Sequence, residues 1–357
     1  MNIAVVGLHF GAEFVPLYRK HPDVDRVGVC DLDPSVMAEV ADRFGIEDRF
    51  QSLEAVLADD RFDAVHLFTP VPFHAEQTLN VLLAGRHCAC AVPMATRLED
   101  LRRIVNAQRE SGKNFMMMET AVYDRAFLFA KDLLDRGELG MLTFLRGDYY
   151  QDLEGDFPAY WREVPPMHYA THALSPLLAL ARTRASTVTC LGSGHLRPDI
   201  QQPGGNTFPL QSALFRLDGT DVIAQLTRSW FQVAREFTEA FSVYGDRRGF
   251  EWQQLDQEDP VMFTLEPVKP GVRGRSVTTQ RISVPYRPDL YPAELAEYIA
   301  GWHGGSHPHL AHEFVRSIVE GRPPAIDAVT AANWTAAGIC ANDSALLGGA
   351  LVAIPGF

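Results

Sequence analysis

Two histidines in the middle of the chain have a spacing that suits proton transfer. His168 and His172 lie four residues apart, shortly after Pro165 and Pro166. Residues four apart share one face of an α-helix, and an imidazole titrates near neutral pH. Either side chain could therefore act as a general base toward a substrate hydroxyl. The alternative interpretation is that one or both of them cap or pack the helix.

A second group of residues suits a polyhydroxylated ligand. Tyr149, Tyr150, Gln151 and Asp152 follow one another at the end of an expected strand, where rings could stack on a sugar and polar groups could bind its hydroxyls. The alternative is a solvated strand end. We predict the following substrate-binding residues: Tyr123, Tyr150, Asp152, Tyr169 and Arg228.

Two arginines flank an aromatic pair later in the chain. Arg228 and Arg235 stand on either side of Trp230 and Phe231. A guanidinium can bind an anionic group through two parallel hydrogen bonds. The two side chains could equally form ion pairs on the surface of a sheet.

The start of the chain is typical of a dinucleotide-binding unit. Residues 2–6 predict a buried strand, Gly7 allows a tight turn, and Gly11 allows close packing of the following helix. Asp31 ends the second strand and could accept hydrogen bonds from ribose hydroxyls, which favours NAD over NADP. His9 stands where this fingerprint has its second glycine, so the alternative is a similar unit that binds no nucleotide.

Ligands of a parallel sheet lie at the carboxyl ends of its strands. With NAD as the expected cofactor, the residues that we predict to contact it are Gly7, His9, Phe10, Gly11, Ala12, Asp31, Leu32, Thr69, Pro70, His74, Val92, Pro93 and Glu119.

The expected order of strands and helices that position these residues changes near residue 123. Before it, short apolar strands alternate with helices, which is typical of a doubly wound parallel sheet. The expected strands there are 2–6, 24–30, 63–68, 87–92 and 114–118, and the expected helices are 34–44, 52–58, 74–84 and 97–111, the last capped by Thr96.

After residue 123, long strands follow one another with few helices between them. The expected strands are 142–150, 186–193, 211–217, 221–230, 238–244 and 249–255, and the expected helices are 125–136, 309–320 and 328–347. This pattern predicts an α/β chain with two domains. Residues 1–122 form the cofactor domain, and 123–357 form an α+β domain with a mostly antiparallel open sheet, which would bind substrate and mediate oligomerisation.

Charge and composition narrow the class of partner. A net charge of −13 argues against nucleic acid and anionic membranes. No apolar run is long enough to span a membrane, and no basic segment precedes an apolar run at the N-terminus, so we expect no signal peptide. The cysteines number five, an odd count that favours free thiols in the cytoplasm.

Four histidines lie close together near the C-terminal end. His303, His307, His309 and His312 could bind a metal, although no cysteine is near and Glu313 is the closest acid. We expect no metal here and interpret the segment as a helix start.

Several of these segments together resemble the glucose-fructose oxidoreductase/inositol dehydrogenase/MocA (Gfo/Idh/MocA) family. They are the opening unit, Thr69-Pro70, residues 87–94, residues 167–176 and the tail from Gly304 onward. The resemblance implies NAD(P)-dependent redox chemistry on sugars, cyclitols or glycosides. It also implies a Rossmann domain followed by an open-sheet domain that often forms dimers or tetramers, so we expect a homodimer or homotetramer.

The chain departs from the family pattern where the family carries chemistry. The family usually has Glu-Lys-Pro at the end of its fifth strand, whereas this chain has Ala91-Val92-Pro93. The family's Asp-x-x-x-His motif corresponds here to a stretch that begins with His168 and keeps the distal His172. His172 is therefore the predicted base, with His168 as its partner or substitute.

Three functions remain open at this point. The first is an NAD-dependent oxidoreductase that oxidises a secondary hydroxyl of a sugar, cyclitol or glycoside. The second is an NAD-dependent glycosidase or lyase that oxidises transiently and eliminates, with no net redox change. The third is a non-catalytic nucleotide-binding homologue, which the missing family lysine would explain.

Overall fold

The computed structural model describes residues 1–203, 205–255 and 258–357, and the chain forms two compact units. The first unit comprises Met1–Tyr123, Tyr286–Ala332 and Phe357, and the second comprises Asp124–Pro285 and Asn333–Gly356. This division differs from the two continuous domains 1–122 and 123–357 that we predicted, because the chain returns to the first unit after residue 285.

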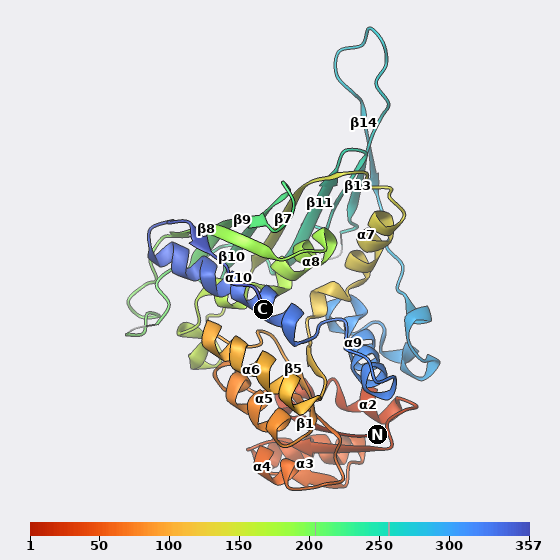
Figure 1. The fold of residues 1–357 in the computed structure, drawn as a ribbon, viewed down its shortest axis with the longest axis vertical. Helices are drawn as coiled ribbons and strands as arrows, with labels where there is room; N and C mark the ends of the chain where they lie inside the picture. The colour runs from red at the N-terminus through yellow and green to blue at the C-terminus, as the bar shows by residue number, and fades with distance from the viewer. Residues whose placement is uncertain (204, 256–257) are drawn as a thin grey trace. The chain divides into compact units, whose positions relative to one another are not determined.

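The first unit contains the predicted parallel sheet. Its strand order is β3-β2-β1-β4-β5-β6, and every pair in it is parallel (Figure 1). The central strands are buried on both faces, and apart from Asn2 in β1 and His66 in β4 their residues are apolar. The strands are β1 Asn2–Val6, β2 Arg26–Cys30, β3 Asp48–Phe50, β4 Ala64–Leu67, β5 His87–Cys90 and β6 Phe115–Met117. The helices among them are α1 Leu8–Gly11, α2 Val15–Lys20, α3 Pro34–Phe44, α4 Leu53–Leu57, α5 His74–Leu83 and α6 Leu98–Ser111.

Local details of this unit differ from the predictions. The helix expected after the glycine turn is divided into the short helices α1 and α2. Helix α6 has Arg97 as its N-cap and no side-chain cap hydrogen bond, so the predicted capping by Thr96 is wrong. Strand β3 was not predicted, because three residues are too few to show an alternating pattern.

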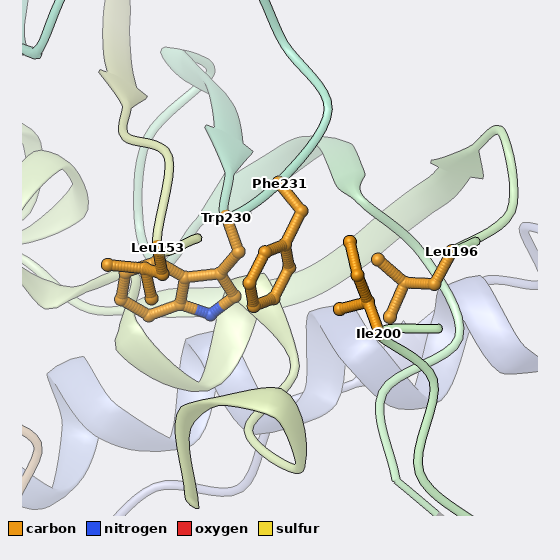
Figure 2. Close-up of a cluster of buried hydrophobic side chains, with 5 residues drawn as sticks. All are labelled: Leu153, Leu196, Ile200, Trp230 and Phe231. Carbon is orange, nitrogen blue, oxygen red and sulfur yellow. The ribbon is translucent and has the colours of Figure 1, made fainter. Parts of the chain in front are cut away.

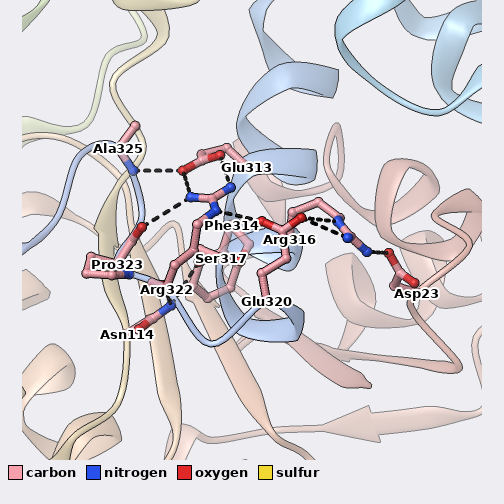
Figure 3. A network of polar contacts seen from close by, with 10 residues as sticks. All are labelled: Asp23, Asn114, Glu313, Phe314, Arg316, Ser317, Glu320, Arg322, Pro323 and Ala325. Carbon is pink, nitrogen blue, oxygen red and sulfur yellow. Dashed lines mark hydrogen bonds and ion pairs between the residues drawn. The ribbon is translucent and has the colours of Figure 1, made fainter.

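Polar contacts attach the C-terminal segment to the first unit (Figure 3). Arg322 on this segment forms two 2.7 Å hydrogen bonds with Glu313 of α9 (Trp302–Val319). Asn114 donates from Nδ2 to the Arg322 carbonyl oxygen at 2.9 Å, and Arg316 binds Asp23 at 3.0 Å. The Asn114–Arg322 and Asp23–Arg316 partners are 208 and 293 residues apart in sequence, so no local pattern could reveal them.

The second unit is built on a mostly antiparallel sheet, as predicted. Its strand order is β14-β13-β12-β11-β7-β10-β9-β8-β15, in which β7 and β10 are parallel (Figure 1). A Cβ atom at Gly147 would lie 2.3 Å from the Ala173 carbonyl oxygen, so a glycine on β7 lets helix α8 approach closely. The strands are β7 Leu142–Tyr150, β8 Ala185–Ser193, β9 Leu210–Leu217, β10 Ile223–Ser229, β11 Thr238–Gly245, β12 Arg248–Glu251, β13 Val261–Leu265, β14 Val277–Arg281 and β15 Val352–Ala353. The long helices are α7 Arg125–Asp135, α8 Thr171–Ala181 and α10 Ala328–Leu346. Helix α10 is divided between the units, and its residues from Asn333 onward belong to this one.

The last strands of this sheet were not predicted. Strand β12 ends at Glu251, four residues before the predicted end at Leu255. Strands β13 and β14 form a hairpin that extends beyond the rest of the sheet (Figure 1). All of β14 is exposed, so it lacks the alternating burial that marks a strand in the sequence.

A buried apolar cluster lies where β10 ends. Figure 2 shows Trp230 and Phe231 beside Leu153, Leu196 and Ile200, which come from separate loops. Trp161 and Tyr169 pack against this cluster. The loops that follow β7 and β10 are thus held by aromatic packing.

Candidate functional site

The turn after β1 can only be made by glycine. Gly7 has φ of +87°, and a Cβ atom there would lie 2.8 Å from the backbone of Phe68. At Gly11 a Cβ atom would lie 2.8 Å from the Phe68 ring and 3.1 Å from Val5. The two glycines therefore have the turn and packing roles that the nucleotide-binding pattern requires.

Asp31 supports the same turn from the end of β2. Its carboxylate accepts hydrogen bonds from the backbone N–H groups of Leu8 at 2.7 Å and Asp33 at 2.9 Å. Each carboxylate oxygen can accept more than one hydrogen bond, so Asp31 can still accept from a ribose hydroxyl. The predicted contacts His9, Phe10 and Leu32 are exposed around it, and Ala12 is half-buried. This turn fits a dinucleotide.

His74 joins the ends of two strands. Its Nδ1 lies 2.7 Å from the Pro93 carbonyl oxygen, and its Nε2 lies 2.8 Å from that of Thr69. Carbonyl oxygens only accept, so both nitrogens donate and the ring is an imidazolium. Burial alone would lower its pKa, but the Cys90 side chain and the two carbonyl groups raise the pKa to about 9. Both ring nitrogens are thus occupied by the protein, and contact between His74 and a cofactor stays a prediction.

The other predicted contacts of this unit lie at or beyond strand ends. Val92 and Pro93 are buried after β5, and Pro70 is exposed after β4. Glu119 is buried after β6, where its Oε1 accepts from the Ala121 N–H at 3.0 Å. Their contact with a cofactor stays a prediction.

Tyr123 belongs to the first unit and packs on the histidine-rich helix α9. Its ring stacks on His309 with centroids 6.1 Å apart, and Tyr291 contacts His309 edge-on at 4.6 Å. Burial, with Arg287, lowers the pKa of His309 to about 4.

The other histidines of this segment have different neighbours. His307 packs on Phe14 at 4.7 Å, and His312 hydrogen-bonds His21 at 2.9 Å. His309 and His312 thus have different neighbours, although their spacing suggested that they face together.

His172 is held among aromatic rings in the second unit. It lies in the first turn of α8 and is 6% exposed. Its ring stacks on Tyr149 with centroids 5.7 Å apart and contacts Tyr169 at 5.2 Å. Its Nδ1 lies 4.0 Å from the Glu239 carboxylate. An imidazole with an acid behind one nitrogen is suited to accept a proton at the other.

A cross-strand row explains this arrangement. Arg228 on β10, Tyr149 on β7 and Glu239 on β11 are directly paired across three adjacent strands. Residues that are paired in this way point to the same face of a sheet. A cation, a ring and an acid are therefore held side by side, and His172 packs on the central ring.

Arg228 is fully buried between two rings. Its guanidinium carbon lies 3.5 Å from the Tyr149 ring centroid and 3.8 Å from that of Trp230. Burial lowers its pKa to about 10, so it remains a cation at neutral pH. Its Nη1 donates to the Ser229 carbonyl oxygen at 3.1 Å, whereas Nε and Nη2 have no hydrogen-bond partner.

Comparisons with known proteins agree with this architecture. The profile of the family described as "Oxidoreductase family, NAD-binding Rossmann fold" (GFO_IDH_MocA) matches residues 1–119. The first third of the chain therefore matches the Gfo/Idh/MocA family. A levoglucosan dehydrogenase crystallised with NADH and levoglucosan has the same fold, with a TM-score of 0.81 and 19% identity over 99% of both chains.

The curated relatives match only part of this chain. A glycosyl hydrolase family 109 protein of Porphyromonas gingivalis is 26% identical over 201 residues, which are 50% of this chain and 42% of the relative. The levoglucosan dehydrogenase of Pseudarthrobacter phenanthrenivorans is 30% identical over 138 residues, or 38% of this chain and 35% of the relative. The chain thus spans less than half the length of these relatives.

Two expectations about the family's helix motif are corrected. His168 lies on the short 3-10 helix η4 (Pro166–Tyr169), whereas α8 begins at Thr171, so His168 and His172 do not share one regular helical face. Burial lowers the pKa of His168 to about 4. On a regular helix Tyr169 would point away from the face of His172, whereas here it contacts the His172 ring.

The predicted substrate residues divide between two faces of the sheet. Side chains alternate along β7, so Tyr150 lies on the face opposite Tyr149, near Asp148. Asp152 is exposed and accepts a hydrogen bond from the Glu154 N–H at 2.8 Å. Tyr150 and Asp152 are therefore not part of the row around His172.

The sequence reasoning did not single out Glu239 or assign Trp230 a role. The sequence does show Glu239 as a lone acid within the largely apolar strand β11, and this could have marked it as a functional residue. The signal for Trp230 was its place beside Arg228.

Proposed function

We propose that this protein is an NAD-dependent oxidoreductase that acts on a secondary hydroxyl of a sugar, cyclitol or glycoside. The observation that carries the proposal is His172, a buried imidazole with an acid 4.0 Å behind it and two tyrosine rings packed on it. NAD, bound through the Gly7 turn and Asp31, would accept the hydride.

The second unit supplies the proton chemistry in this proposal. His172 removes the hydroxyl proton, and Glu239 orients the ring and stabilises the imidazolium that forms. Tyr149 and Tyr169 hold the His172 ring in place by aromatic packing. Val92 stands where the family has its lysine and cannot transfer a proton, so the base must come from elsewhere.

The second candidate is redox-neutral glycoside cleavage. Oxidation of a ring hydroxyl acidifies the neighbouring C–H, elimination releases the leaving group, and the hydride then returns. The glycosyl hydrolase family 109 relatives favour this alternative. A non-catalytic nucleotide-binding homologue remains the third.

A single assay separates these functions. The purified protein is incubated with NAD and a panel of sugars, cyclitols and glycosides, while absorbance at 340 nm and released products are recorded. Accumulating NADH supports the oxidoreductase, whereas glycoside cleavage without net NADH selects the second candidate. Neither signal, with no cofactor binding, would overturn both.

We further propose a homodimer or homotetramer in the cytoplasm. The outward face of the second-unit sheet exposes Leu191 (59%), Leu214 (51%) and Ile223 (37%). Such a face is often covered by a second copy. Among the described residues, no helix is long and apolar enough to cross a membrane.

A further inference from the structure

Resting on the function proposed above, we propose that the substrate carries a carboxylate, as in a uronate or an aldonate, and that Arg228 binds it. Arg228 is the only member of the Arg228–Tyr149–Glu239 row that bears a permanent positive charge. Its position decides which substrates the second unit can hold.

The two nitrogens of Arg228 that lack partners are the informative pair. Nε and Nη2 lie along one edge of the guanidinium plane, and within residues 1–203, 205–255 and 258–357 neither has a hydrogen-bond partner within 3.5 Å. This edge presents two parallel N–H groups, which match the two oxygens of a carboxylate. The remaining nitrogen, Nη1, is already occupied by the Ser229 carbonyl oxygen at 3.1 Å.

Aromatic rings hold the plane of the Arg228 guanidinium. Tyr149 and Trp230 cover the two faces of the guanidinium at 3.5 and 3.8 Å, and Tyr169 lies at 5.8 Å. The stacked rings hold the plane in one orientation, so little rotational freedom is lost when an anion binds. A buried donor edge of this kind is costly unless a partner satisfies it.

The charged residues around Arg228 favour a ligand group that carries a single negative charge. Glu239 is two strands away from Arg228, roughly 10 Å by ordinary strand spacing, so it stabilises the cation from a distance without filling the donor edge. A carboxylate brings one charge to one buried cation. A phosphate dianion would bring a second charge that nothing in this row compensates.

The position of Arg228 relative to His172 suits a sugar acid. Arg228 and His172 both pack on the Tyr149 ring, 3.5 and 5.7 Å from its centroid. The same ring therefore fixes both groups, and the proposal places one sugar-sized molecule against both. The carboxylate would anchor at Arg228, and a secondary hydroxyl of the same molecule would lie toward the base.

Binding and turnover are tested separately. Calorimetry on the wild-type protein with NAD compares D-glucuronate with D-glucose, D-galacturonate with D-galactose, and D-gluconate with sorbitol. The same pairs are then assayed for NADH and for released product. We expect the carboxylate of at least one pair to bind roughly 10–100-fold more tightly, as a bidentate charged contact allows.

Arg228→Lys keeps the positive charge but removes the two parallel N–H groups. It should therefore abolish most of the preference for the carboxylate over its neutral partner. Arg216→Lys, an exposed arginine on β9, is the matched control and should leave the preference unchanged. If Arg228→Lys fails to fold, the wild-type comparison still decides. Equal binding of acid and neutral partner in every pair overturns the inference. Preferential binding of the acid without NADH or product leaves the inference standing and refutes the proposed oxidoreductase.

Discussion

At the scale of single residues, one strand pairing determines the environment of the candidate base. Glu239 and Tyr149 are direct partners on β11 and β7, and His172 contacts both. His168, by contrast, sits in a separate 3-10 turn, where burial lowers its pKa to about 4. His172 is therefore the better candidate of the two.

Replacing His172 tests this assignment. His172→Ala should lower kcat on the true substrate by roughly 10²–10⁴, the usual effect of removing a positioned base. NAD affinity should stay nearly unchanged, because the cofactor turn belongs to the first unit. Steady-state kinetics and NAD titration measure both, with the exposed His195→Ala as control. Near-normal turnover in His172→Ala would rule out this base and direct attention to Tyr169 or His168.

Asp31 makes a second test possible at this scale. Asp31→Ala should weaken NAD binding by roughly 1–3 kcal/mol, because ribose hydroxyls and the Leu8 N–H both lose an acceptor. Titration with NAD and NADP should show NAD bound more tightly by the wild type, since Asp31 repels a 2′-phosphate. Asp42→Ala, an exposed acid on α3, serves as control. Tighter binding of NADP by the wild type would contradict the prediction.

At the scale of elements, His74 connects strand ends that carry predicted cofactor contacts. It begins α5 and bridges the segments after β4 and β5 through the carbonyl groups of Thr69 and Pro93. A charged ring is needed for both bonds, so the connection depends on pH.

The sign of this dependence follows from the raised pKa. In the folded state the pKa of His74 is about 9, above the ordinary 6.5 of an unfolded histidine. Its contribution to stability is therefore complete below about pH 6.5 and is lost as pH rises through 9. His74→Asn should lower stability by about 1–3 kcal/mol near pH 6, as expected when buried acceptors lose a partner.

Thermal unfolding of wild type and His74→Asn from pH 6 to 10 measures this effect. The difference in Tm should narrow toward pH 10. A difference that stays constant over this range would show that the ring is not an imidazolium. His195→Ala again provides the control, because that side chain is exposed.

At the scale of the whole molecule, the open face of the second-unit sheet predicts self-association. Leu191, Leu214 and Ile223 come from three adjacent strands and share one face. Burying these side chains between two copies would remove apolar area from water.

Light scattering at micromolar concentration should give the mass of a dimer or tetramer. Leu214→Glu should shift the distribution toward the monomer, because it places a charge in the interface. Leu83→Glu changes a more exposed leucine of the first unit (70% against 51% for Leu214) and should have no effect. A monomeric mass for the wild type would refute the assembly.

The sequence by itself determined the parts of this protein that depend on local periodicity and turn chemistry. The parallel sheet of the first unit follows from apolar strands that alternate with helices, and its cofactor turn follows from Gly7, Gly11 and Asp31. The open sheet of the second unit and the end positions of α3 were also predictable, because Asp33 caps that helix and Gly45 ends it.

Only the tertiary structure decided which distant residues meet. Glu239, Tyr149 and Arg228 are brought together by strand order, a choice among many pairings that strand pattern does not encode. The return of residues 286–332 to the first unit rests on contacts between side chains more than 200 residues apart. His74 illustrates the same limit, because its charge is set by two carbonyl groups that become its partners only after the sheet has formed.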